Sequence, residues 1–335
     1  MIGYGAWGKH HAAAIRDAPG LTLAGVACGG EASAAAARHD LPGVSIHRDY
    51  RDLLRDPSIE AVDIVTPNHL HAEMGVAALE AGKDVLLEKP MAITVAECDR
   101  LVAAAERTGR VLSIGHELRL STQWAAIKRM LDGGEIGDPL YALISLFRFP
   151  YRPGAGGWRH DAPRVGSWIL EEPVHFFDFL MWYFEPLGDP TSVLAVGNSK
   201  GREPGMSDNF STILRFPRGV YTVITQTLAG FEHHHVVELV GSEGAIRTWW
   251  SATDARTLEP AHELKVQRRG ATACETVKLA PSGELFELAE EIRQTAAAFR
   301  ARRPIVSAVE GRKRIVVCLE AERSLREGRE LSLRF

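Results

Sequence analysis

The sequence predicts an α/β protein in which a doubly wound parallel sheet is followed by an α+β domain with an open, mainly antiparallel sheet. Two observations predict it. Between Leu21 and Gly115, short apolar segments alternate with alanine-rich helical stretches, which is typical of repeated βα units. After about Arg119, longer β-rich segments follow one another with hairpin-like turns between them. We therefore predict two domains, residues 1–118 and residues 119–335.

In the first domain, apolar segments rich in β-branched residues predict short strands. These are Leu21–Ala27, Val44–His47, Val62–Thr66, Val85–Leu87 and Val111–Ile114. Helices are predicted between them at Trp7–Asp17, Glu31–Arg38, His69–Ala81 and Val95–Arg107. Several of these helices are followed by glycine, as helix ends often are.

In the second domain, β-rich segments predict strands at Leu140–Phe149, Ser192–Asn198, Phe210–Phe216, Val220–Leu228 and Val236–Val240. Short turns at 217–219 and 241–244 require the strands on either side to be antiparallel. Helices are predicted at Gln123–Leu131, Glu284–Arg300 and Val309–Arg326.

Composition excludes several classes of protein. The net charge of −4 argues against sequence-independent nucleic-acid binding, which needs a basic surface. No apolar run reaches the roughly 18 residues of a membrane span, and no signal-peptide pattern opens the chain. The 4 cysteines are far apart and form no C-x-x-C pair, so neither a zinc site nor a disulfide framework is indicated. We predict a cytoplasmic protein without a metal site.

The motif Gly3-Tyr-Gly5-Ala6-Trp7-Gly8 matches the glycine fingerprint of a dinucleotide-binding turn. The first glycine permits the tight turn, the second lets backbone approach a pyrophosphate, and the third lets the following helix pack closely. The helix N-terminus then faces the phosphates. An ordinary glycine-rich turn is the alternative, and the βα pattern that follows favours the dinucleotide site.

The strand before this turn is unusually short. Only Met1 and Ile2 precede Gly3, whereas a strand normally spans about five residues. Because this strand is central in such a sheet, its absence is expected to leave neighbouring backbone groups unpaired. Either the chain as given starts late or the fold tolerates a short first strand.

The end of the next strand bears on the choice of cofactor. An acid is expected there if NAD is bound, because it holds the ribose 2′-hydroxyl. Here Gly29 takes that place, Glu31 follows slightly late, and no Arg or Lys is adjacent to meet a 2′-phosphate. The cofactor is therefore NAD or NADP, with NAD slightly preferred because Glu31 would repel a phosphate.

Two further segments lie where parallel strands end and ligand loops gather. The first is Thr66-Pro67-Asn68-His69-Leu-His71, predicted to line the nicotinamide half of the crevice. As a plain turn, it would use Asn68 as a helix cap and His71 as a structural residue. The second is Glu88-Lys89-Pro90, where a strand-end lysine is either a solvated charge or part of the chemistry.

These motifs together resemble the Gfo/Idh/MocA family of oxidoreductases. The resemblance also rests on Ala78-Leu-Glu-Ala-Gly82 before the Glu-Lys-Pro motif and on Gly134-Glu-Ile-Gly137-x-Pro139. It implies a Rossmann domain, a second domain whose sheet commonly mediates oligomers, here a homodimer or homotetramer, and redox chemistry on sugars and polyols. It further implies that Lys89 contacts the substrate hydroxyl, that Glu88 helps to position the nicotinamide, and that a cis peptide often precedes the proline.

The second half of the family's site is an acid four residues before a histidine, with another acid three residues later. Here the residues are Glu171, His175 and Asp178, and the spacing places them on roughly one helix face. Pro173 complicates this, so we expect the helix to begin near Pro173 with Glu171 just before it. The family usually has Asp and Gly at positions 171 and 173. Alternatively, His175 is a buried helix residue bound to Asp178.

Alcohol oxidation needs a base for the hydroxyl proton and a cation near the same oxygen. Lys89 and His175 can divide that work, with Glu171 orienting the histidine. Which of the two accepts the proton is open, and we prefer His175 as the base. All of this requires Lys89 and His175 to meet over one face of the nicotinamide.

Substrate-facing candidates follow from position. His116 and Arg119 come after the last Rossmann strand, and Trp158-Arg159 lie in a loop with glycines at 154, 156 and 157. The triplet 233–235 of histidines cannot converge on a metal because strand neighbours point to opposite faces, although one outer histidine could line the substrate pocket.

Three functions remain at this point. The first is an NAD(P)-dependent oxidoreductase acting on a secondary alcohol of a sugar, cyclitol or related polyol. The second is a glycoside-cleaving enzyme that oxidises its sugar transiently with a bound nicotinamide. The third is a non-catalytic regulator that senses the cofactor, against which the presence of both Lys89 and His175 argues.

Overall fold

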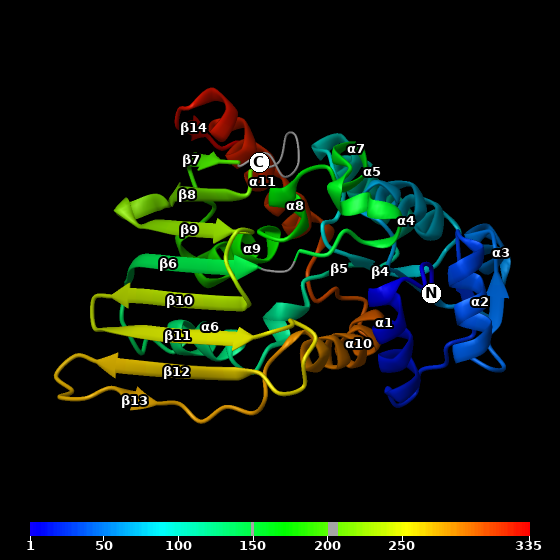
Figure 1. Cartoon of the computed structure of the whole chain (residues 1–335), viewed down its shortest axis with the longest axis horizontal. Coiled ribbons are helices and arrows are strands. Elements are labelled where there is room, and N and C mark those ends of the chain that lie inside the picture. The colour runs from blue at the N-terminus through cyan, green and yellow to red at the C-terminus, as the bar shows by residue number, and fades with distance from the viewer. Residues whose placement is uncertain (149–150, 200–206) are drawn as a thin grey trace. The chain divides into compact units, whose positions relative to one another are not determined.

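The computed structural model describes residues 1–148, 151–199 and 207–335 (Figure 1). The chain forms two compact units that are not continuous in sequence. Unit 1 comprises Met1–His116, Pro153–Glu171 and Leu288–Ile315, and unit 2 comprises Glu117–Arg152, Glu172–Glu287 and Val316–Phe335. Residues late in the sequence thus belong to the first unit.

Unit 1 has the predicted alternation of parallel strands and helices. Its strands are β1 (Gly25–Ala27), β2 (Ser45–His47), β3 (Ala61–Ile64), β4 (Asp84–Glu88) and β5 (Leu112–Gly115). Its main helices are α1 (Ala6–Asp17), α2 (Glu31–Asp40), α3 (Tyr50–Arg55), α4 (His71–Glu80) and α5 (Val95–Thr108). The pairs β1·β2, β3·β4 and β4·β5 are all parallel, so the predicted doubly wound sheet is confirmed. The sequence missed α3, which has only six residues.

The strand at the centre of this sheet is very short. Ile2 forms isolated parallel bridges to Ala27 on one side and to Ile64 on the other, joining β1–β2 to β3–β5. Beside Met1 lies a cavity of about 630 Å³, lined mainly by residues 20–25, 58–63 and part of α10. The short first strand expected from the sequence is therefore a single residue bridged to both neighbours.

Segments from later in the chain complete unit 1. Helices α7 (Ala162–Val165) and α8 (Trp168–Glu171) belong to it, as does most of α10 (Glu284–Arg300). Leu288 and Ile292 of α10 form a buried cluster with Leu86 of β4, against which Trp7 and Ile15 of α1 pack. This cluster fixes α1 against the sheet, and α1 carries the glycine turn at its start.

Unit 2 is built on a nine-stranded sheet in the order β13-β12-β11-β10-β6-β9-β8-β7-β14. The strands are β6 (Pro139–Arg148), β7 (Ser192–Asn198), β8 (Asn209–Arg215), β9 (Tyr221–Thr227), β10 (His233–Gly241), β11 (Gly244–Ala252), β12 (Ala261–Arg268), β13 (Glu275–Thr276) and β14 (Leu331–Ser332). Only β6·β9 is parallel among the pairs of the described sheet, so the prediction of a mainly antiparallel sheet is confirmed. The sequence missed β11 to β14, and the predicted end of β6 at Phe149 lies outside the described residues.

The turns predicted as hairpins join antiparallel strands. The 217–219 turn connects β8 to β9 and the 241–244 turn connects β10 to β11, as the sequence indicated. One face of the sheet is covered by α6 (Trp124–Asp132) and α9 (Val174–Tyr183), where Trp124 packs on Phe179 and Phe176 packs on His235 (Figure 1). Helix α11 (Ala308–Glu327) contributes its second half to unit 2.

No helix in the described parts of the chain is long and apolar enough to cross a membrane.

Candidate cofactor and active site

The glycine turn has the backbone geometry that the fingerprint requires. Gly3 has φ +100°, and a Cβ there would lie 2.2 Å from the carbonyl oxygen of Val65. A Cβ on Gly8 would lie 2.4 Å from the carbonyl oxygen of Gly3, so the helix can approach the turn only without a side chain. Gly5, the N-cap of α1, has open space around its Cβ position. The turn therefore offers bare backbone and a helix N-terminus to an anion.

A network of hydrogen bonds connects α1, which follows this turn, to β3 and β4. The Glu88 carboxylate accepts hydrogen bonds from Trp7 Nε1 at 2.9 Å and from the Lys89 backbone N–H at 3.1 Å. His11 is fully buried, with Nε2 at 3.1 Å from Glu88 Oε1 and Nδ1 at 2.9 Å from Asp63 Oδ2. Helix α1 and the ends of β3 and β4 are thus tied together at the point where Lys89 begins.

The charges in this network favour an ionised centre. Burial opposes a charge on His11, but Asp63 and Glu88 outweigh it and raise the pKa of His11 well above its ordinary value. Burial likewise opposes ionisation of Glu88, yet His11 and then Lys89 hold its pKa below the usual range. Burial first, and then the charge of Glu88, raises the pKa of nearby Glu291 well above its ordinary value. These shifts favour the charged forms of His11 and Glu88 and the neutral form of Glu291.

Lys89 directly follows the C-terminal end of β4. Its ammonium donates to the backbone carbonyl of Glu171 at 2.9 Å, and the Lys89-Pro90 peptide bond is cis, as the resemblance implied. The Glu171 carboxylate is buried and pairs with Arg159 at 2.9 Å, while the Arg159 guanidinium lies 5.4 Å from the Trp158 ring centre. Four predicted site residues of unit 1 therefore lie in one connected group.

The 66–71 turn is bound to the same region. His71 is buried and its two ring nitrogens lie 2.7 Å from the Pro90 carbonyl and 2.8 Å from the Thr66 carbonyl. These two contacts connect the segments that follow β3 and β4, which is a structural role for His71. Burial lowers the pKa of His71. Asn68 donates to the Val165 carbonyl at 2.9 Å and caps no helix, so the capping interpretation was wrong. Pro67 is the N-cap of the short 3-10 turn Asn68–Leu70.

In unit 2, α9 begins after Pro173, which confirms the predicted helix start. His175 is buried, with Nε2 3.8 Å from Glu117 Oε1. Asp178 accepts from Arg119 Nε at 2.7 Å and from Nη2 at 2.5 Å. Arg119 therefore forms a buried fork with this carboxylate. The alternative in which His175 is bound to Asp178 stays a prediction.

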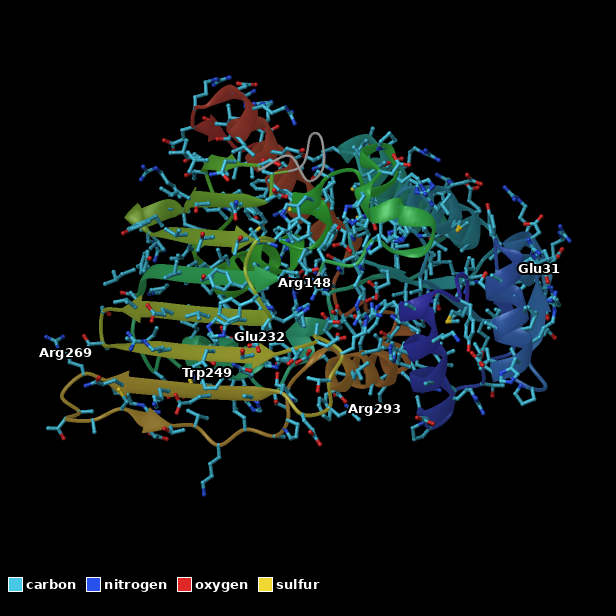
Figure 2. The ribbon with its side chains drawn as sticks, in the orientation of Figure 1. Glu31, Arg148, Glu232, Trp249, Arg269 and Arg293 are labelled. Carbon is cyan, nitrogen blue, oxygen red and sulfur yellow. The ribbon has the colours of Figure 1, made fainter. Side chains whose placement is uncertain are left out.

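Sequence reasoning missed Arg148, at the carboxyl end of β6 (Figure 2). It is buried, 2.9 Å from Glu172, with Nη1 2.7 Å from Nδ1 of His233 across the strand pair. His235 lies two residues further on the same face, among aromatic rings. The signal was present, because strand alternation places an arginine at 148 on the inward face with Leu146.

His116, the last residue of the first segment of unit 1, is buried, and Arg119 is likewise buried in unit 2. Lys89 and Glu171 belong to unit 1 and His175 belongs to unit 2. The meeting of Lys89 and His175 over one nicotinamide face, and the contacts of His116, Arg119 and Trp158 with substrate, therefore stay predictions. Among the described residues, no group of three or more His, Cys, Asp or Glu is arranged to hold a metal ion.

The end of β1 differs from the sequence interpretation in one respect. Arg48, which follows β2, donates from Nε to the Cys28 carbonyl at 3.2 Å and from Nη2 to the Gly29 carbonyl at 3.0 Å. It also pairs with Glu31, which is 2.9 Å from Arg38. The statement that no cation stands beside this position was wrong, because β2 lies next to β1 in space.

These features fit a dinucleotide. The bare backbone at Gly5 suits a pyrophosphate, and Thr66 Oγ1, inaccessible to solvent, has no hydrogen-bond partner in the described structure. Residues 1–116 match the family model "Oxidoreductase family, NAD-binding Rossmann fold", and residues 124–247 match "GFO/IDH/MocA C-terminal domain". The chain belongs to the Gfo/Idh/MocA oxidoreductase family. As a member, it is an NAD(P)-dependent dehydrogenase or reductase.

Two relatives are similar to this chain in sequence, and a solved structure is similar to it in fold. The chain is 34% identical to 1,5-anhydro-D-fructose reductase of Ensifer adhaerens over 70% of its own length and 69% of that protein. It is 35% identical to inositol 2-dehydrogenase of Salmonella typhimurium over 41% of its length and 38% of that protein. The fold is similar to that of levoglucosan dehydrogenase in complex with NADH and levoglucosan, with a TM-score of 0.85, 23% identity and coverage of 100% and 98%.

Proposed function

We propose that this enzyme oxidises or reduces a secondary alcohol or ketone of a sugar, cyclitol or related polyol, with Lys89 and His175 acting on the substrate oxygen. The names of its relatives, a reductase of an anhydrosugar and a dehydrogenase of inositol, support this substrate class. The observation that carries the proposal is the placement of Lys89, whose ammonium is held at 2.9 Å from the Glu171 carbonyl and whose backbone is held by Glu88.

A nicotinamide bound at the glycine turn would supply the hydride chemistry. Lys89 polarises the substrate oxygen with its ammonium group. In oxidation His175 takes the hydroxyl proton at a ring nitrogen, and in reduction it returns a proton to the substrate oxygen. Glu88, fixed by Trp7 and His11, keeps the backbone of Lys89 in place. Arg159 neutralises the buried Glu171 carboxylate. The main-chain carbonyl of Glu171 accepts the hydrogen bond from the Lys89 ammonium.

Replacing Lys89 tests the proposal. We expect Lys89→Ala to lower kcat by about 10²–10³ while the dissociation constant for NAD(P)H changes little, because the ammonium acts on the substrate oxygen. Stopped-flow turnover and fluorescence titration of the reduced cofactor measure the two effects. Lys265→Ala, which replaces a half-exposed lysine paired with Glu263 in unit 2, is the control. Equal losses in turnover and cofactor binding would contradict the assignment.

The substrate class is tested by a panel of sugars, anhydrosugars and cyclitols, with both cofactors, followed by nicotinamide absorbance. Reduction of the cofactor by free polyols supports the proposal. Release of an aglycone without net reduction would indicate the glycoside-cleaving alternative. Cofactor binding without turnover on any compound would indicate the regulator.

We also propose that the uncovered face of the unit 2 sheet joins copies of the chain into a homodimer or homotetramer. Phe147, Tyr221 and Val240 are each about two-fifths exposed there, at 38%, 42% and 41%. Tyr141 lies opposite Tyr221, with ring centres 5.1 Å apart. Light scattering of the wild type and of Tyr221→Lys tests the assembly.

The four cysteines are free thiols, which supports the predicted cytoplasmic location.

A further inference from the structure

We infer that Arg48 and Arg38 recognise a 2′-phosphate on the adenosine ribose, so that this enzyme prefers NADP(H) to NAD(H). The inference rests on the proposed function only in requiring that a nicotinamide dinucleotide binds at the glycine turn. It concerns the opposite end of that cofactor from Lys89. The sequence slightly favoured NAD, and the spatial neighbours of Glu31 are the reason to revise that preference.

The first observation is what stands at the end of β1. In NAD enzymes an acidic side chain there holds the ribose hydroxyls. Here Cys28 is followed by Gly29, whose Cβ position has open space around it, so the strand end provides no acceptor side chain. A ribose placed there meets main chain and whatever neighbouring elements supply.

The neighbouring element supplies a guanidinium. Strands β1 and β2 are parallel, with Ala27 opposite His47, so their carboxyl ends lie on the same edge of the sheet. Arg48 is the next residue, and its Nε and Nη2 are anchored on the carbonyls of Cys28 and Gly29 at 3.2 and 3.0 Å. The guanidinium is thereby fixed at the position where an NAD enzyme carries its acid, and its charge is opposite.

A second guanidinium faces the same point from α2. Arg38 lies 2.9 Å from Glu31, and Arg48 contacts the other oxygen of the same carboxylate. Two cations therefore share one exposed carboxylate, which leaves a net positive charge. Glu31, labelled in Figure 2, has 67% of its side chain exposed. Exposed ion pairs of this kind contribute little stability, so Glu31 can leave when a phosphate arrives.

Phosphate suits this arrangement better than carboxylate. A 2′-phosphate carries up to two negative charges and three acceptor oxygens, and planar guanidinium groups bind such oxygens in pairs. Glu31 then acts as a removable counter-ion that keeps both guanidinium groups in place before the cofactor binds. Glu31 therefore competes with the 2′-phosphate for the two guanidinium groups, whereas the acid of an NAD enzyme binds the ribose itself.

Titration calorimetry with fragments of the cofactor tests the inference on the full chain. The probes are 2′,5′-ADP and 5′-AMP, which differ only in the 2′-phosphate. We expect the wild type to bind 2′,5′-ADP at least about tenfold more tightly than 5′-AMP. Arg48→Gln should abolish most of that ratio, and Arg38→Gln should reduce it by less. Arg55→Gln, an exposed arginine paired with Asp52 in the same unit, is the matched control and should leave the ratio unchanged.

The effect of Glu31→Gln on ligand affinity has opposite directions for a preference for NADP(H) and for a preference for NAD(H). If the inference holds, the variant binds 2′,5′-ADP more tightly than the wild type, because a repulsive charge is removed. Weaker binding of 5′-AMP and of NADH by Glu31→Gln would overturn the inference and assign Glu31 to the ribose of NAD. Equal wild-type affinities for the two probes would also overturn it.

Titration with the intact cofactors separates this inference from the proposed function. Tighter binding of NADH than of NADPH contradicts only the role of Arg48 and Arg38. Failure of both cofactors to bind contradicts the proposed function and the inference together.

Discussion

The buried carboxylates on either side of His11 in unit 1 share an imidazole, whereas Asp178 and Glu172 in unit 2 are each paired with a guanidinium group. In unit 1, His11 lies between Asp63 and Glu88. In unit 2, Arg119 binds Asp178 and Arg148 binds Glu172. An imidazole changes charge near neutral pH, whereas a guanidinium stays charged throughout. The comparison indicates that pH acts more on the contacts of His11 than on the pairs of Arg119 with Asp178 and of Arg148 with Glu172.

The largest expected effect comes from breaking the pair that anchors α9. Arg119→Met leaves the Asp178 carboxylate buried without its cation, and we expect a loss of about 3–5 kcal/mol in the free energy of unfolding. Urea unfolding at pH 7.5, followed by circular dichroism, measures it. The double variant Arg119→Met with Asp178→Leu should recover most of the loss, because no charge then stays buried. A double variant as unstable as the single one would show that the pair is not the cause.

Glu287 sharpens the comparison because it is a buried carboxyl of unit 2 bound by Ser282 and the Gly283 N–H instead of an arginine. Burial raises the pKa of Glu287 to about 7 from its ordinary 4.5. Because the folded value is the higher one, its contribution to stability is complete below about pH 4.5 and is lost as pH rises through about 7.

We therefore expect Glu287→Gln, which stays neutral, to be more stable than the wild type at pH 8.5, by up to about 3 kcal/mol. The advantage should shrink as pH falls to 5. Thermal unfolding at the two pH values measures it, with Glu243→Gln, an exposed carboxyl paired with Arg269, as the control. An advantage of the same size at both pH values would refute the titration of Glu287.

The smallest expected effect concerns His11. Its pKa is raised in the folded state, so its stabilising contribution is complete below the ordinary value of 6.5 and declines as pH rises towards the folded value. We expect His11→Gln to cost about 1–3 kcal/mol at pH 6 and less at pH 9. The exposed His39→Gln, whose partner is Asp40, is the matched control. A loss that grows with pH would mean that His11 is buried as the neutral imidazole.

Local signals in the sequence located much of the fold and of the candidate site. The glycine turn and the start of α9 after Pro173 were predicted correctly, because each depends on residues within a few positions of one another. The strands predicted to end at Thr66 and Leu87 exist and end within two residues of those positions, at Ile64 and Glu88. The same local reasoning failed for Asn68, which caps no helix and binds Val165, 97 positions away. It also did not find Arg119 as a partner of Asp178, 59 positions away.

What the sequence alone determined was therefore the order of elements and the faces of the strands, since these follow from periodicity and turn chemistry. The tertiary structure decided which charges meet. It paired His11 with residues 52 and 77 positions away and set Arg48 beside Glu31, 17 positions away. Electrostatic partners depend on distance in space, and parallel strands bring together ends that a helix and its loops separate along the chain.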